Sequence, residues 1–75
     1  MNDGKEYGLI LFHSVHHALK AEKVLKSGGI IHKLIPVPKE ISSDCGVCLR
    51  FLIADRAVIE QMLAGKAEFR EIRTI

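Results

Sequence analysis

The sequence has few aromatic residues and no long apolar run. It has no Trp, one Tyr and three Phe among 75 residues, so its core must be mainly aliphatic. No apolar run reaches the roughly 18 residues that a membrane span needs. The first residues lack the charged and apolar regions of a signal peptide. We therefore expect a cytoplasmic protein with no membrane partner.

The charge balance argues against a nucleic-acid partner. Eleven basic residues face nine acidic ones, and the basic residues are spread along the chain without interleaved aromatics. At 48% hydrophobic and 27% charged, the composition is that of a soluble globular protein. The length predicts a single domain over residues 1–75. A chain of this size buries only roughly 60–65% of its unfolded surface, which leaves little room for a deep substrate cavity.

Periodicity and turn residues predict six elements in the order βαββαβ. Ser14 is a good N-cap for the first helix, and Gly28 and Gly29 end it. Asp55 is the expected N-cap of the second helix, and Gly65 closes it. The predicted elements are a strand at 7–12, a helix at 15–27, a strand at 30–35, a strand from 47 to 53, a helix between 55 and 65, and a strand at 69–75.

This order is typical of the ferredoxin-like α+β fold, with one antiparallel sheet and both helices on one face. In that topology the junction between the first strand and the first helix shares one end of the sheet with the turn between the second and third strands. We therefore expect His13 and Ser14 to lie near Cys45, although about thirty residues separate them. The apolar run Ile72 to Ile75 at the C-terminus offers an edge that could pair across a homodimer.

The run Asp44-Cys45-Gly46-Val47-Cys48 carries the strongest chemical signal. A thiol reacts as its thiolate, and a helix N-terminus or a protonated imidazole lowers the pKa of a nearby thiol. Gly46 removes a side chain next to the sulfur and so eases the approach of a partner. Cys45 sits in the turn, whereas Cys48 already belongs to the next strand, so Cys45 is the candidate reactive residue.

Three other interpretations of the two cysteines stay open. Both could be small apolar residues at the start of a strand. They could form a thiol-redox pair, although no helix follows the motif as it does in thioredoxin-like proteins. They could also bind zinc or iron together with His13 and with His16 or His17. Adjacent His16 and His17 point about 100° apart on a helix, so both cannot serve easily.

Glu22 falls in the middle of the apolar stripe predicted for the first helix, which is formed by Val15, Ala18, Leu19 and Leu25. A buried carboxylate needs a partner. Glu22 either reaches a buried polar group or bends outward to pair with Lys26 or Arg50. The predicted stripe of the second helix is Val58, Ile59, Met62 and Leu63, and His32, beside Lys33, is expected at the surface.

Five runs of the sequence match a known family pattern: Phe12-His13-Ser14, Ala18-x-x-x-Glu22-x-x-Leu25, Leu34 to Pro38, Pro36 to Gly46, and Leu49-Arg50. With these runs the chain resembles the selenium/sulfur carrier protein-like family, short bacterial domains long catalogued as being of unknown function. The resemblance implies that Cys45 holds sulfur or selenium as a persulfide-type adduct, in a turn shaped by Pro36, Pro38 and Gly46. It also matches Glu22 and Arg50 to recurrent positions without an assigned role. Cys48 departs from the pattern, which leaves it as a resolving thiol or a small apolar residue.

The function expected from this resemblance is that of a carrier without turnover of its own and without a cofactor. Its partners would be a protein donor and a protein acceptor of sulfur or selenium. The alternatives are a metal-binding or thiol-redox module that uses Cys45 and Cys48, and a non-catalytic interaction domain in which both thiols are inert.

Overall fold

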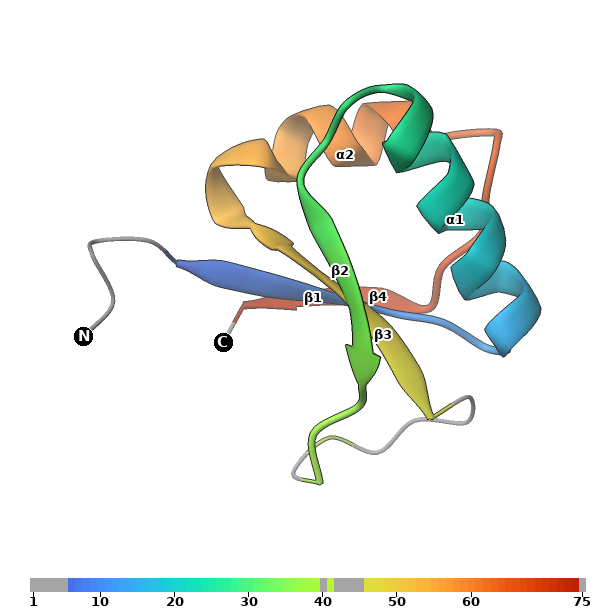
Figure 1. Ribbon diagram of the computed structural model, residues 1–75, viewed down its shortest axis with the longest axis vertical. Helices are drawn as coiled ribbons and strands as arrows, with labels where there is room; N and C mark the ends of the chain where they lie inside the picture. The colour runs from blue at the N-terminus through green and yellow to red at the C-terminus, as the bar shows by residue number, and fades with distance from the viewer. Residues whose placement is uncertain (1–5, 40, 42–45, 75) are drawn as a thin grey trace.

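The computed structural model describes residues 6–39, 41 and 46–74, and over these residues the chain forms one sheet and two α-helices (Figure 1). The order of elements is the predicted βαββαβ. Neither α-helix in this part of the chain is long and apolar enough to cross a membrane. The elements are β1 (Tyr7–Leu11), α1 (Val15–Ser27), β2 (His32–Pro36), β3 (Val47–Leu52), the 3-10 helix η1 (Ile53–Asp55), α2 (Arg56–Leu63) and β4 (Glu71–Thr74).

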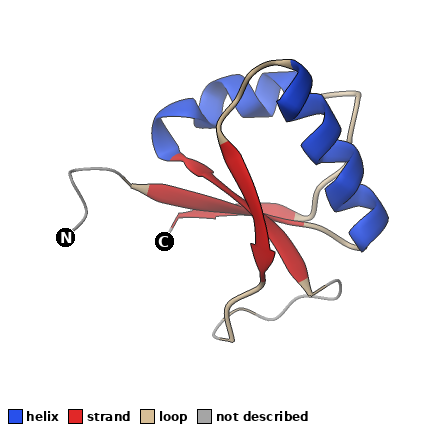
Figure 2. Ribbon diagram, viewed as in Figure 1, coloured by secondary structure: helices blue, strands red, loops and turns tan. Residues whose placement is uncertain are grey.

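The four strands pair antiparallel in the order β2-β3-β1-β4, so β1 and β3 are central and β2 and β4 are edges. Helix α1 connects β1 to β2 across β3, and α2 connects β3 to β4 across β1. Both helices cover the same face of the sheet (Figure 2). Two interleaved βαβ units of this kind define a ferredoxin-like α+β fold, which confirms the predicted fold class.

Local signals fix both ends of α1 where the sequence predicts them. The Ser14 hydroxyl accepts a hydrogen bond from the His17 backbone N–H at 3.3 Å. At the other end, the N–H of Gly29 donates to Lys26 and that of Ile30 donates to Leu25. These two bonds form the cap that commonly ends a helix with a glycine at positive φ, and Gly29 has a φ of 73°.

The same cap explains why β2 starts later than predicted. Ile30 is tied to the end of α1, so the strand begins at His32 instead of residue 30. It then continues to Pro36, which an edge strand tolerates because its outer N–H groups need no partner. β1 ends one residue early, at Leu11, and the described part of β4 is shorter than the predicted 69–75.

The core lies between the sheet and the helices, on what we call the helix face. Gly8 allows the tight packing of this face, because an added Cβ would lie 2.5 Å from Cζ of Phe51. The buried residues of this core are Ile10, Phe12, Ala18, Ala21, Leu25, Leu49, Phe51, Ile59 and Leu63.

The predicted apolar stripe of α1 is wrong in its phase. Ala18 and Leu25 are buried as expected, but Ala21 is the third buried position, whereas Val15 and Leu19 are 46% and 50% exposed. Two alanines on the inner side let the helix approach the sheet closely, which turns the larger side chains outward. In α2, Ile59 and Leu63 are buried as predicted, but Val58 is half-exposed.

Candidate functional site

Three connections leave the sheet at the same end, which we call the loop end. Leu11 at the end of β1 lies opposite Cys48 in β3 and Glu71 in β4. Pro36 at the end of β2 lies opposite Val47. The β1–α1 junction, the β2–β3 connection and the α2–β4 loop therefore leave the sheet at the same end, as the topology predicts. Figure 1 shows that the twist of the sheet spreads them apart.

Cys45, the candidate carrier residue, lies outside the described residues, as does Asp44. The next residue, Gly46, is described, and its carbonyl accepts a hydrogen bond from the Val37 N–H at 3.0 Å. Gly46 has a φ of 79°, in the left-handed region that favours glycine. This bond closes the base of the β2–β3 connection and fixes the residue after Cys45 against the start of β3.

Cys48 lies on the face opposite the helices, which we call the second face. Its side chain is fully buried in a small cluster with Leu9 and Leu11, against which Ile35 and Val37 pack. His16, by contrast, lies on α1, on the other side of the sheet. The structure therefore does not bring together Cys48 and His16, two members of the predicted metal set. Within residues 6–39, 41 and 46–74, no group of three His, Cys, Asp or Glu side chains could hold a metal ion.

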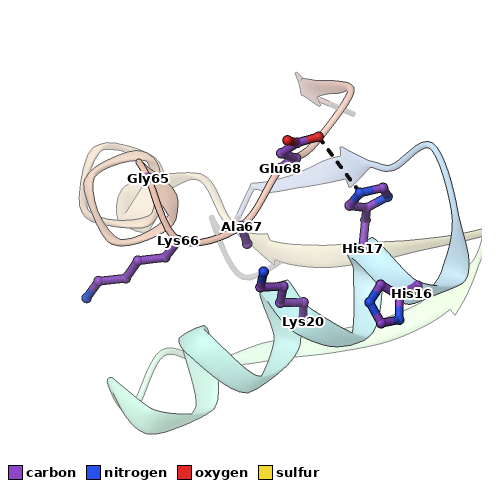
Figure 3. A pocket seen from close by; sticks show the side chains of 7 residues that line it. All are labelled: His16, His17, Lys20, Gly65, Lys66, Ala67 and Glu68. Atoms are coloured by element: carbon purple, nitrogen blue, oxygen red, sulfur yellow. Dashed lines mark ion pairs between the residues drawn. The ribbon is translucent and has the colours of Figure 1, made fainter.

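A chain of polar contacts joins the start of α1 to the α2–β4 loop, and Figure 3 shows one link of it, the ion pair between His17 and Glu68. The Ser14 Oγ lies 2.8 Å from His17 Nδ1, and His17 Nε2 lies 3.8 Å from Glu68 Oε1. Because Ser14 Oγ already accepts from the His17 backbone N–H, its own proton is available to Nδ1. In that arrangement Nε2 carries the proton of the neutral ring and faces the carboxylate. Ser14 thus sets the orientation of the His17 ring, and the exposed Glu68 carboxylate lies on the other side of that ring.

The other imidazoles of the loop end surround His17. The ring centroid of His13 lies 6.5 Å from that of His17, and His16 lies 6.2 Å away. His13 and His16 are exposed, whereas His17 is about one-third exposed. A pocket of about 390 Å³ opens between α1 and the α2–β4 loop (Figure 3). It is lined by His16, His17, Lys20, Gly65, Lys66, Ala67 and Glu68.

Sequence reasoning missed Glu68 and Lys66 as parts of this end. The signal was available in the predicted topology, because a second helix that crosses back over the sheet must deliver its following loop to the same end as Ser14. The residues 64–70 carry no motif of their own, so only the spatial argument could have found them.

Glu22 and Arg50 do not pair, because Arg50 lies on the second face of the sheet. Its guanidinium carbon instead lies 4.6 Å from the centre of the Tyr7 ring. Glu22 Oε2 lies 3.8 Å from Nε2 of the nearly buried His32, so the observed arrangement is the alternative in which Glu22 reaches a buried polar group. Neither Lys26 nor Arg50 is its partner. The prediction that His32 is a surface residue is also wrong: its side chain is 9% exposed, and its Nδ1 donates to the carbonyl of Ile30 at 2.7 Å.

The fold and the loop end define a small ferredoxin-like domain whose Ser, His and Glu side chains share one end of the sheet with a Cys-Gly connection. The chain belongs to the family described as "Putative Se/S carrier protein-like", whose model matches residues 7–72. It is also similar to "Uncharacterized protein YtiA" of Escherichia coli (strain K12), with 27% identity over 64 residues. That match covers 85% of this chain and 74% of the relative. No solved structure matches the chain.

Proposed function

We propose that this protein carries sulfur or selenium on Cys45 and passes it between protein partners. The observation that carries the proposal is the family match, because it spans residues 7–72 and so includes the Cys45-Gly46 pair. The placement of Gly46 at the loop end, which it shares with Ser14, supports the proposal.

The transfer chemistry needs no oxidant or reductant. The Cys45 thiolate attacks the terminal sulfur of a donor persulfide, a new S–S bond forms at Cys45, and the donor S–S bond breaks. The electron pair of the broken bond leaves with the donor thiolate, so the oxidation state is conserved overall. Transfer to an acceptor thiolate repeats the exchange in the other direction, and a terminal selenium follows the same course.

The loop end supplies the electrostatic support that a thiolate or persulfide anion needs. The N-terminal turn of α1 carries no acidic residue, so the positive end of its dipole is not neutralised there. We assign His13 and His17, which lie at the same end of the sheet as Gly46, as sources of positive charge or of a proton, with Ser14 holding the His17 ring. Gly46 supplies the turn geometry. Cys48 is assigned a packing role, because its side chain is buried on the second face.

The proposal is tested by incubating the purified chain with a persulfide donor and measuring its intact mass. We expect wild type and Cys48→Ala to gain the mass of sulfur and Cys45→Ser to gain none. Cys48→Ala is the matched control because it removes one of the two cysteines. No addition to wild type, or equal addition to Cys45→Ser, contradicts the proposal.

The same samples distinguish a metal or thiol-redox module. That alternative predicts bound zinc or iron in the purified protein, or a reversible bond between Cys45 and Cys48. Elemental analysis and a thiol count before and after mild oxidation measure both. We expect no stoichiometric metal, and we expect two titratable thiols in the unfolded protein both before and after mild oxidation.

A further inference from the structure

A row of cations crosses the second face of the sheet, away from the loop end. Lys33 in β2 lies directly opposite Arg50 in β3, Arg50 lies opposite Leu9 in β1, and Leu9 lies opposite Arg73 in β4. Arg73 has a carboxylate partner, since its Nε lies 2.7 Å from Glu71 Oε2. Lys33 and Arg50 form no ion pair with any described residue.

Two like charges directly opposite each other on neighbouring strands destabilise a sheet. A long side chain in that position would normally turn away into solvent. Arg50 is held instead, because its guanidinium carbon lies 4.6 Å from the centre of the Tyr7 ring. Lys33 and Arg50 therefore place two positive charges side by side on the second face. Neither charge has a carboxylate partner among the described residues.

A pocket of about 300 Å³ lies at the same place. Its apolar wall includes Ile31, which is 71% exposed although it is large and hydrophobic. β2 is an edge strand, and no described strand pairs with its outer side. An anion held here would thus have cations on one side, an apolar surface beside it and an open strand edge. The lining residues are Tyr7, Ile31, His32, Lys33, Arg50, Phe51 and Leu52.

We propose that this β2-edge site, defined by Tyr7, Ile31, Lys33 and Arg50, docks an acidic extended segment of a protein partner. A carboxylate of the segment bridges Lys33 and Arg50, while an apolar neighbour covers Ile31. The segment's backbone pairs with the outer edge of β2, a common mode of recognition for extended segments. An extended protein segment fits this site better than a small anion does. The segment can contact the two cations, the apolar side chain of Ile31 and the free edge of β2, whereas a small anion contacts only the cations.

The site rests on the proposed function in one respect, since a carrier must dock its donor and acceptor. Lys33 is three residues from Pro36, so a segment that follows β2 reaches the loop end after roughly 10 Å. A partner docked on Lys33 and Arg50 therefore has the start of the β2–β3 connection, the segment that contains Cys45, within reach.

The test is a nuclear magnetic resonance titration of the full chain with two capped peptides. Both alternate Val and Thr, one has a central Glu and the other a central Gln. We expect the Glu peptide to shift the amides of β2, Tyr7 and Arg50, and to bind about tenfold more tightly than the Gln peptide because its hydrogen bonds are charge-assisted. Arg50→Gln should remove that preference. Lys23→Gln, which removes a charge from the exposed side of α1, should keep it.

Equal affinity for the Glu and Gln peptides overturns the proposal, as do shifts centred on Lys20 and Lys66. A dimer that sedimentation detects and that Arg50→Gln dissociates also overturns it, because it assigns the edge to a second copy of the chain. The Cys45→Ser variant separates the two proposals. It lacks the proposed carrier residue but keeps the β2-edge site, so peptide binding to it measures docking alone. Wild type that binds the peptide but accepts no sulfur contradicts only the carrier function.

Discussion

The two faces of the sheet carry different kinds of side chains. The helix face is mainly apolar, and Ile10, Leu49 and Phe51 are buried there under both helices. The second face is divided along the strands. Near the loop end it holds the buried cluster around Leu11 and Cys48, and farther from that end it carries a row of cations. The difference shows that the main hydrophobic core lies on one face, whereas the other face combines a small buried cluster with cationic side chains.

The largest expected effect comes from breaking the helix face. Phe51→Ala should lower the free energy of unfolding by about 3–5 kcal/mol, because it leaves a cavity in the centre of the core. Denaturant unfolding followed by circular dichroism measures the change. Leu19→Ala is the control, since this half-exposed side chain should change stability by no more than about 0.5 kcal/mol. Similar losses in both variants would contradict the observed orientation of α1.

A smaller effect is expected from the buried cluster of the second face. Cys48→Ser should cost about 1–3 kcal/mol, because it places a hydroxyl among Leu9 and Leu11. Cys48→Ala should cost less, since it leaves only a small cavity. If the serine variant is as stable as wild type, the side chain is not buried as described. Thiol alkylation provides a second readout, because Cys48 should react only as fast as the chain opens.

The turn at the base of the β2–β3 connection should contribute about 1–2 kcal/mol. Gly46→Ala places a Cβ on a residue with a φ of 79°, a conformation that costs an L-residue this amount. Among the described residues, and apart from the chain neighbours of Gly46, no heavy atom lies within 4 Å of that Cβ, so the penalty expected from them is conformational and not steric. Gly46→Asn should recover part of the loss, because Asn tolerates this region better. Equal stabilities of the Ala and Asn variants would argue against the conformational explanation.

The smallest effect has the opposite sign. Lys33→Gln should leave the protein as stable as wild type or raise its stability by about 0.2–0.5 kcal/mol, because it relieves repulsion across the strand pair from Arg50. The gain should disappear in high salt, which screens exposed charges. Unfolding at two salt concentrations measures this difference. A clear loss of stability would show that Lys33 has a stabilising partner.

Sequence periodicity was sufficient for the fold but not for the rotation of α1. The stripes 15, 18, 19, 25 and 18, 21, 25 share two positions, and both fit a helical period. Hydrophobicity alone favours Val15 and Leu19 over Ala21. Packing decides between the two stripes, because the small side chains of Ala18 and Ala21 allow close contact between the helix and the sheet. This contact cannot be predicted from the sequence of the helix alone.

The candidate site was predictable only in its topology. The shared end of Ser14 and Gly46 follows from the order of the elements, and the structure has this arrangement. The pairing of Glu22 with His32 was not foreseen, because the strand was expected to start two residues earlier and His32 was read beside Lys33 as a surface residue. Alternate residues of a strand point to the same face of the sheet. His32 and Leu34 are two residues apart, so placing Leu34 on the helix face would also have placed His32 there.

The most direct test of the account is to locate the transferred atom within the wild-type chain. Cleavage after Lys39 and Arg50 releases one peptide that contains both cysteines, and its fragmentation distinguishes them. After incubation with a persulfide donor, we expect the added sulfur on Cys45 and none on Cys48, whose side chain is buried on the second face. Sulfur found mainly on Cys48, or on neither residue, would contradict the account.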